Sequence, residues 1–70
     1  RVACLLRELN GSVKVSLRGK GDVDVQQIAA QFGGGGHVTA SGCSVAGPLS
    51  EATRLVLAAV RRAVDAKAGS

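Results

Sequence analysis

The chain has almost no aromatic residues. Phe32 is the only one among its 70 residues, and Trp, Tyr and Met are absent. A platform that stacks successive bases on aromatic rings therefore cannot be built here, although many proteins bind single-stranded nucleic acid in that way. The chain also lacks any run near the ~18 uninterrupted apolar residues that a membrane-spanning helix requires. We therefore expect a globular protein with no membrane partner.

Residues that could hold a metal or act as nucleophiles are also scarce. The chain has one histidine, two cysteines and five scattered acidic residues. A hydrolytic metal site needs several such ligands that converge. We therefore expect a domain that binds a ligand but does not catalyse a reaction by itself, and that holds no cofactor. Cys4 and Cys43 each lie among apolar residues, and we interpret them as buried thiols of a cytoplasmic protein.

The charge balance is basic. Nine Lys and Arg residues against five acidic residues give a net charge of +4. This balance suits an anionic partner, although a modest excess of basic residues is also common on ordinary surfaces. The length allows a single domain, residues 1–70. Because the first residues enter an apolar run without a leader pattern, we interpret the chain as a fragment of a longer protein.

The first part of the chain predicts a β-hairpin. Residues 2–9 are apolar on both faces until Arg7, which predicts a strand covered on both sides. Asn10-Gly11 favours a type I′ turn. From Ser12 onward apolar and polar residues alternate, which places Lys14, Ser16 and Arg18 on one polar face.

The remainder predicts two helices and one strand. Asp24 is a candidate N-cap for a two-turn helix that Gly33 ends. Residues 38–41 are compatible with a single helical turn, residues 43–46 alternate as a short strand, and Ser50 is placed to cap a last helix. The expected inner stripe of that helix is Ala52, Leu55, Val56, Ala59, Val60 and Ala63. The order β-β-α-β-α predicts a small two-layer α/β (α+β) domain, a mixed sheet started by a hairpin with helices packed on it.

Four consecutive glycines, residues 33–36, run into the single histidine, His37. Glycine loses more conformational freedom on folding than any other residue, so the run needs a reason. Gly33 is explained by the end of the helix. The other three form either a flexible spacer or a backbone that approaches an anion, and we favour the anion. His37 supports this interpretation because imidazole can donate to a phosphate oxygen.

The string VSLRGKGDVDVQQIAAQFGGGGHVTASGCSV, residues 15–45, resembles the DHH-associated domain at the C-terminus of DHH-family phosphoesterases. In that family a strand with a Ser-x-Arg pattern precedes Asp-Val, a helix, a Gly-Gly-Gly-His loop and an Ala-x-Gly turn. The subgroup that this chain resembles most is the small oligoribonucleases (nanoRNases) that also remove phosphate from 3′-phosphoadenosine 5′-phosphate.

The resemblance implies a division of labour. Catalysis would belong to an N-terminal DHH domain of the same chain, with divalent metal, usually manganese, while the present domain would grip short RNA or a nucleoside bisphosphate. It also implies that His37 contacts the substrate near the scissile end and that Arg18, with Ser16 on the same face, contacts its phosphate or base. The loop glycines that would let the backbone approach the nucleotide are Gly34, Gly35 and Gly36.

Two positions depart from the family pattern. Many relatives have a second serine where this chain has Gly19, and a basic or polar residue where it has Val38. Short RNA, a nucleoside bisphosphate and a cyclic dinucleotide therefore all remain open as ligands. A different interpretation is an interaction or dimerisation module. Similar domains occur at the C-terminal end of alanyl-tRNA synthetases, and an apolar first strand can pair with the edge strand of a partner.

Overall fold

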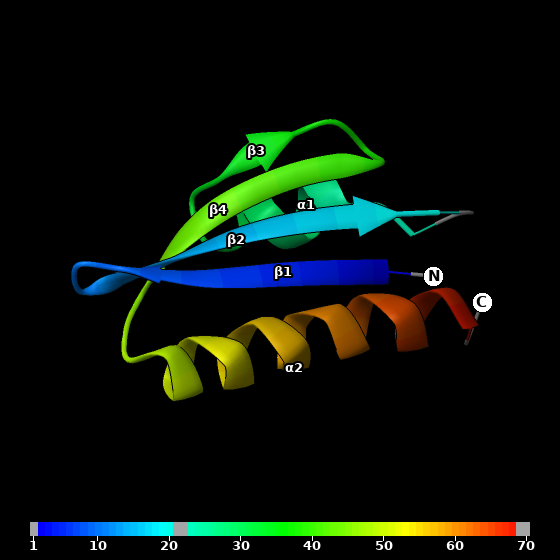
Figure 1. Ribbon diagram of the computed structural model, residues 1–70. Helices are drawn as coiled ribbons and strands as arrows, with labels where there is room; N and C mark the ends of the chain where they lie inside the picture. Colours follow the sequence, from blue (N-terminus) through cyan, green and yellow to red (C-terminus); the bar gives the residue numbers. More distant parts are fainter. Residues whose placement is uncertain (1, 21–22, 69–70) are drawn as a thin grey trace.

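The structure is a computed structural model that describes residues 2–20 and 23–68, without the side chains of residues 67 and 68. Four strands form one sheet in the order β1-β2-β4-β3, and both helices cover the same face of it (Figure 1). In chain order the elements are β1 (Val2–Leu9), β2 (Ser12–Gly19), α1 (Val25–Ala30), β3 (Gly35–Gly36), β4 (Ala40–Ala46) and α2 (Leu49–Ala68). The prediction of a small two-layer α+β domain is confirmed.

The sheet is antiparallel throughout, whereas the sequence predicted a mixed sheet. The difference comes from β3, a two-residue strand that the sequence analysis did not anticipate. After α1 the chain first forms β3 and then reverses in a tight turn into β4. This additional reversal makes β4 antiparallel to β2, where a direct return from a helix would have made it parallel.

The predicted hairpin is confirmed. Asn10 and Gly11 have φ values of 25° and 82°, as a type I′ turn between β1 and β2 requires. The Ser12 hydroxyl also donates to the Leu9 carbonyl at 3.2 Å. This turn fixes the register, so the polar residues of β2 lie on one face and its apolar residues face the helices.

β1 was predicted to be covered on both faces, and this prediction is wrong. β1 is an edge strand whose residues Val2, Cys4 and Leu6 pack against the core, while Leu5 on the opposite face is 70% exposed. The reason is that α1 and α2 both lie on the same side of the sheet. No second layer of described residues lies over the other side.

Helix α1 begins and ends as predicted. The Asp24 carboxylate accepts hydrogen bonds from the backbone N–H groups of Gln26 at 2.9 Å and Gln27 at 3.2 Å. After the helix, Gly33 has a φ of 79°, which is the left-handed conformation that commonly ends a helix. The Gln26 side chain leaves the helix to donate to the carbonyl of Gly36 at 2.9 Å, which ties α1 to β3.

Residues 38–41 do not form the predicted helical turn. His37 and Ala40 exchange backbone hydrogen bonds of 2.7 and 3.2 Å, so the chain reverses at residues 38–39. β4 therefore starts at Ala40, before the strand predicted at residues 43–46. Pairing of β3 with β4 decides this, because the backbone groups of residues 41 and 42 are in register with Gly36 and Gly35.

Helix α2 begins at Leu49, so Ser50 lies inside its first turn and does not cap it. Leu55 was expected in the inner stripe but is 37% exposed. The other predicted stripe residues are buried (Ala52, Val56 and Ala59) or partly buried against the core (Val60 and Ala63).

The core lies between the helices and the inner face of the sheet. Its fully buried large side chains are Val13, Val15, Leu17, Val25, Ile28 and Val56. Because β2, α1 and α2 all contribute to this list, the domain has a hydrophobic core of its own. In the part of the chain described, no helix combines the length and the apolar character needed to cross a membrane.

Candidate functional site

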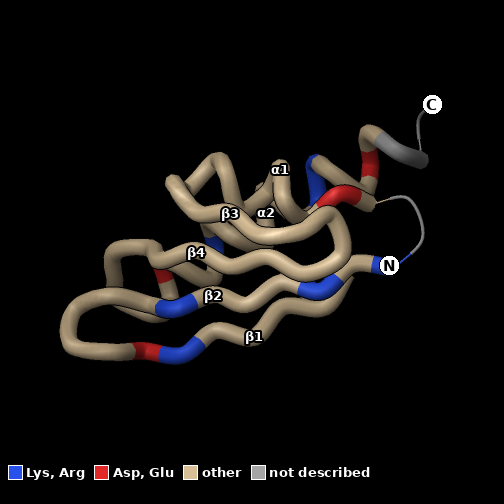
Figure 2. Tube along the Cα trace, turned by 90° about the horizontal axis from the view of Figure 1, so that it is seen from above, with Lys and Arg blue, Asp and Glu red and all other residues tan. Residues whose placement is uncertain are grey.

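The face of the sheet opposite the helices, here called the outer face, carries the candidate side chains. Directly paired residues of neighbouring strands point to the same face, so the strand register defines rows of side chains across the sheet. Three such rows cross the outer face: Ala3–Arg18–Ala40–His37, Leu5–Ser16–Gly42–Gly35 and Arg7–Lys14–Ser44. Figure 2 shows that the basic residues of the sheet lie on the neighbouring strands β1 and β2.

Arg18 and His37 lie in the same row, with Ala40 between them. Neighbouring strands are ~4.8 Å apart, so the two backbones are about 10 Å apart across the sheet. Both side chains are exposed. Ala40, between them, has only a methyl group, so its side chain does not fill the space between Arg18 and His37. The fold thus brings together an arginine and a histidine that are 19 positions apart in sequence.

The backbone around His37 is held by several elements. The turn that follows His37 packs between the ends of β2 and α1. Three hydrogen bonds fix it: the Ser41 hydroxyl donates to the His37 carbonyl (2.5 Å), Gly19 N–H to the Thr39 carbonyl (2.9 Å) and Val25 N–H to the Val38 carbonyl (3.0 Å). His37 is therefore exposed at its side chain but anchored at its backbone.

The four loop glycines differ in what they do for the fold. A Cβ on Gly34 would lie 2.2 Å from the Gly42 carbonyl oxygen, and one on Gly36, whose φ is 144°, would lie 2.7 Å from the Ala40 carbonyl oxygen. Gly34 and Gly36 are thus required by the close packing of the loop on β4, and Gly33 by the helix end. Gly35 differs from the other three. Its backbone is not in the left-handed region, and an added Cβ would have nothing within 4 Å, so neither packing nor conformation requires glycine there.

The backbone of Gly36 turns toward the open edge of the sheet. His37 and Ala40 form a hydrogen-bonded pair, and in an antiparallel ladder the next pair, Gly36 and Ser41, is then not hydrogen-bonded. The Gly36 carbonyl accordingly points away from β4 to accept from Gln26. By the same pattern the Gly36 N–H is not hydrogen-bonded to Ser41 across the ladder.

Comparison with known proteins agrees with this geometry. Residues 1–66 match the model of the DHHA1 domain. The chain belongs to this family. The expected resemblance to the DHH-associated domain is therefore confirmed, and the matched residues include both Arg18 and the glycine loop.

Two curated relatives contain a segment similar to this DHHA1 domain. The bifunctional oligoribonuclease and PAP phosphatase NrnA of Thermus thermophilus is 48% identical over 61 residues, which are 86% of this chain and 19% of the relative. Oligoribonuclease NrnB of Bacillus subtilis is 58% identical over 36 residues, which are 50% of this chain and 9% of the relative. The DHHA1 domain thus spans about a fifth or less of these relatives.

A hollow of about 380 Å³ lies between β2, β4 and the start of the glycine loop of this DHHA1 domain. It includes Ser16 and Gly34 but not the exposed Arg18, Gly35, Gly36 or His37. The full lining is Lys14, Val15, Ser16, Phe32, Gly33, Gly34, Gly42, Cys43 and Ser44. Lys14 was not among the predicted site residues, and its position in the alternating pattern of β2 was the signal that could have pointed to it.

The departure at Gly19 has a structural consequence. A Cβ at this position would lie 2.9 Å from both the Val23 carbonyl oxygen and the Val25 Cγ1 atom. The serine that many relatives have there therefore cannot be accommodated without movement of residues 23–25. The second departure, Val38, is exposed in the turn beside His37 and leaves an apolar side chain near the site.

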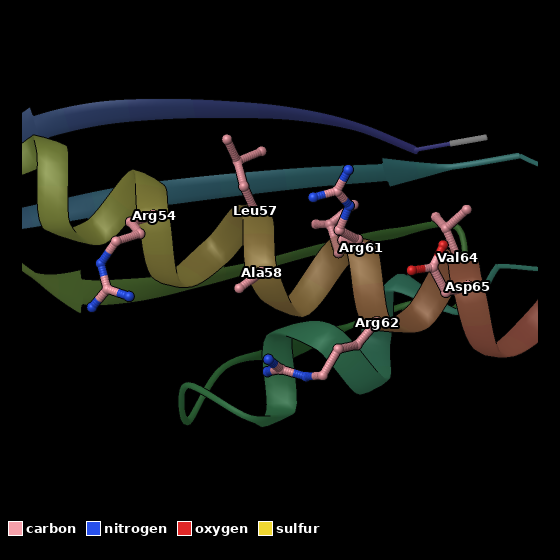
Figure 3. A pocket seen from close by; sticks show the side chains of 8 residues that line it. Arg54, Leu57, Ala58, Arg61, Arg62, Val64 and Asp65 are labelled. Atoms are coloured by element: carbon pink, nitrogen blue, oxygen red, sulfur yellow. The ribbon is translucent and has the colours of Figure 1, made fainter.

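A larger hollow of about 840 Å³ lies elsewhere, along the surface of α2 (Figure 3). It contains none of the predicted site residues, and every residue that lines it belongs to α2. One turn before Leu57, Arg54 forms an ion pair with Glu51, which lowers the pKa of that carboxyl group. Arg62 reaches toward α1, where Gln31 accepts a long hydrogen bond of 3.5 Å.

The described residues of the DHHA1 domain include no grouping of metal-ligand side chains. Among residues 2–20 and 23–68, no three His, Cys, Asp or Glu side chains are grouped as a metal site. Cys43 is buried on the inner face, and its burial raises the pKa of the thiol, which keeps it protonated and unreactive near neutral pH. What the outer face offers is hydrogen-bond donors and positive charge.

Proposed function

We propose that this DHHA1 domain is the substrate-binding domain of a DHH phosphoesterase and that it binds a phosphate-bearing part of short RNA or of a nucleoside bisphosphate. The single observation that carries the proposal is the row in which Arg18 and His37 flank Ala40. An arginine donates two parallel hydrogen bonds to a phosphate, and a histidine adds a third donor from the other side.

The neighbouring groups support the same site. Ser16 lies in the next row with its hydroxyl on the outer face, and Gly35 lies in that row on β3. Gly36 directly precedes His37 in the chain, and its backbone N–H is a further candidate donor to the same phosphate. In this arrangement the space above Gly35, which the fold leaves open, lets a ligand contact the backbone.

The reaction itself is proposed to occur in another domain of a longer, cytoplasmic protein. The T. thermophilus relative is named an oligoribonuclease and PAP phosphatase, and this chain matches only 19% of its length. Divalent metal, with manganese as the expected ion, would be held by an N-terminal DHH domain. The outer face of the present domain would then orient the substrate toward that metal across an interdomain cleft.

The test is a titration of the chain with 3′-phosphoadenosine 5′-phosphate and with a diribonucleotide, followed by the backbone amide signals in NMR spectra. We expect affinities of ~mM, because few phosphate contacts are available. Shifts should centre on residues 34–38 and Arg18. Since a hydrogen bond to a charged group contributes ~1.5–3 kcal/mol, Arg18→Ala and His37→Ala should each weaken binding about tenfold or more.

The matched control is Arg61→Ala, which removes an exposed arginine from α2 on the other layer. It should leave the affinity within about twofold of the unsubstituted chain. An equal loss in Arg61→Ala and Arg18→Ala would mean that only general positive charge attracts the ligand. Absence of shifts at residues 34–38 in a longer chain that includes the DHH domain would refute the site.

One observation favours a second function, the association module. β1 is an edge strand of eight residues with Leu5 exposed at its middle, and a strand of another chain could extend the sheet there. If so, light scattering at micromolar concentration should give the mass of a dimer, and Leu5→Lys should give a monomer. A monomeric unsubstituted chain would reject this alternative.

A further inference from the structure

Two basic residues lie directly opposite each other on the outer face. Arg7 of β1 and Lys14 of β2 are register partners, and both are exposed. Like charges at directly opposed positions of an antiparallel pair destabilise a sheet. Their presence together at one end of the outer face therefore needs a reason outside the stability of the fold.

No carboxylate among the described residues offsets this pair from the outer face. Glu8 is in register with Val13, whose side chain faces the helices, so it points to the inner side of the sheet. Asp24 caps α1, and Glu51 and Asp65 belong to α2 on the opposite layer. The rows of the outer face carry only positive or neutral side chains.

Protection of a sheet edge explains only one of the two charges. A basic residue on an edge strand discourages pairing with other chains, and this accounts for Arg7 of β1. Lys14, however, lies on β2, which is paired with β1 on one side and β4 on the other. A charge at that central position protects no edge.

The two residues also line a hollow. A partly open hollow of about 190 Å³ is lined by Leu5, Arg7, Lys14 and Ser16. A water molecule occupies ~30 Å³ in the liquid, so the space is several times larger than one water. Two cationic residues and a serine thus line this space, and their side chains carry the kinds of donor that a phosphate group requires.

We propose that Arg7 and Lys14 form a second phosphate subsite, which receives a further phosphate of a ribonucleotide chain held at Arg18 and His37. This inference rests on the proposed function and specifies its substrate class. Lys14 and Arg18 are four residues apart on β2, or about 13 Å at ~3.3 Å per residue. A stacked strand rises ~3.4 Å per nucleotide, so the two positions are spanned by up to about four nucleotides, and by fewer in an extended strand.

The spacing favours an oligoribonucleotide over a nucleoside bisphosphate. Both phosphates of a bisphosphate are attached to one ribose, so such a ligand engages Arg18 and His37 without reaching Arg7 and Lys14. Leu5, which is 70% exposed in the row between the two subsites, provides an apolar contact for a base or ribose of the longer ligand. The 380 Å³ hollow extends from Lys14 and Ser16 to Gly33 and Gly34 at the start of the glycine loop, and it stops short of Arg18 and His37.

The experiment compares two ligands in one chain: 3′-phosphoadenosine 5′-phosphate and a 5′-phosphorylated tetra-adenylate, each titrated by NMR at several salt concentrations. The double variant Arg7→Gln with Lys14→Gln should bind the tetranucleotide about tenfold more weakly and the bisphosphate within about twofold of the unsubstituted chain. The subsite receives one phosphate, and each phosphate contact to a single strand contributes ~0.7 to the slope of log affinity against log salt, so the slope for the tetranucleotide should fall by ~0.7.

Two further variants separate the possible results. Arg18→Gln should weaken both ligands, and Arg61→Gln on α2 should weaken neither. If Arg18→Gln has this effect and the double variant changes nothing, the second subsite is rejected and the proposed function remains. If the double variant weakens both ligands equally, Arg7 and Lys14 supply only general attraction and the subsite is again rejected. If Arg18→Gln leaves the affinity for both ligands unchanged, the proposed function fails as well.

The double variant also carries a check on folding. Since it removes two opposed like charges from an exposed row, its Tm should equal or exceed that of the unsubstituted chain. A Tm that falls by more than a few degrees would show that Arg7 and Lys14 stabilise the sheet, and the argument from their repulsion would be wrong.

Discussion

Substitution of alanine at two adjacent loop glycines should have opposite effects on stability. At Gly34 an added Cβ would lie 2.2 Å from the Gly42 carbonyl oxygen and 2.6 Å from the Cys43 Cβ atom. These atoms belong to the backbone and first side-chain carbon of β4, so they cannot rotate away. At Gly35 an added Cβ meets nothing within 4 Å, and the backbone is not in the left-handed region.

The expected magnitudes follow from this difference. Overpacking costs ~1–3 kcal/mol and occasionally more, and contacts this short with fixed atoms place Gly34→Ala at about 3 kcal/mol. In a domain of this size each kcal/mol shifts Tm by ~4–8 °C, so the Tm should fall by about 12–24 °C. Gly35→Ala should stabilise by ~0.4–1 kcal/mol, because alanine restricts the unfolded chain, and raise Tm by a few degrees.

The assay is thermal and urea unfolding followed by circular dichroism, for both variants and the unsubstituted chain. A Gly34→Ala variant that unfolds within ~4 °C of the unsubstituted chain would refute the packing argument. Gly35→Ala adds a second measurement, because its methyl group stands on the outer face beside the proposed site. Weaker binding of 3′-phosphoadenosine 5′-phosphate together with an unchanged or higher Tm would assign Gly35 to the ligand and not to the fold.

Three further predictions concern individual side chains. Asp24→Ala should destabilise the domain by ~1 kcal/mol in urea unfolding, because two N–H groups of α1 lose their acceptor, whereas Asp24→Asn should cost less. Arg54→Ala should return the lowered pKa of Glu51 toward its ordinary value of 4.5 in an NMR titration. The small stabilisation by the pair is complete above pH 4.5 and is lost as the pH falls from there through the lowered pKa. Burial raises the pKa of the Cys43 thiol above its ordinary value of 9.0, so Cys43 should react with iodoacetamide more slowly than half-buried Cys4 when both are monitored by mass spectrometry. Equal reaction rates would contradict the burial of Cys43. The same raised pKa predicts that the stability of the domain declines as the pH rises past 9.0.

Part of the candidate site was accessible from sequence. The period-2 alternation of β2 placed Ser16 and Arg18 on a common polar face, and the structure has them there. Proximity of Arg18 to His37 was implied only by family resemblance, because it depends on β4 lying between β2 and β3. The sequence also could not separate Gly35 from its neighbours, since the crowding at Gly34 and Gly36 comes from the paired strand β4.

The sequence by itself determined the local elements of this protein. Asn10-Gly11 encodes its hairpin turn, Asp24 and Gly33 bound the first helix, and alternation defines the two faces of β2, since each of these effects acts within a few residues. Only the tertiary structure decided that β1 is an edge with Leu5 exposed, that residues 38–39 reverse the chain, and that Arg18 and His37 lie in one row across β4. Those features depend on strand order and on the placement of both helices on one face, which arise from contacts between residues distant in sequence.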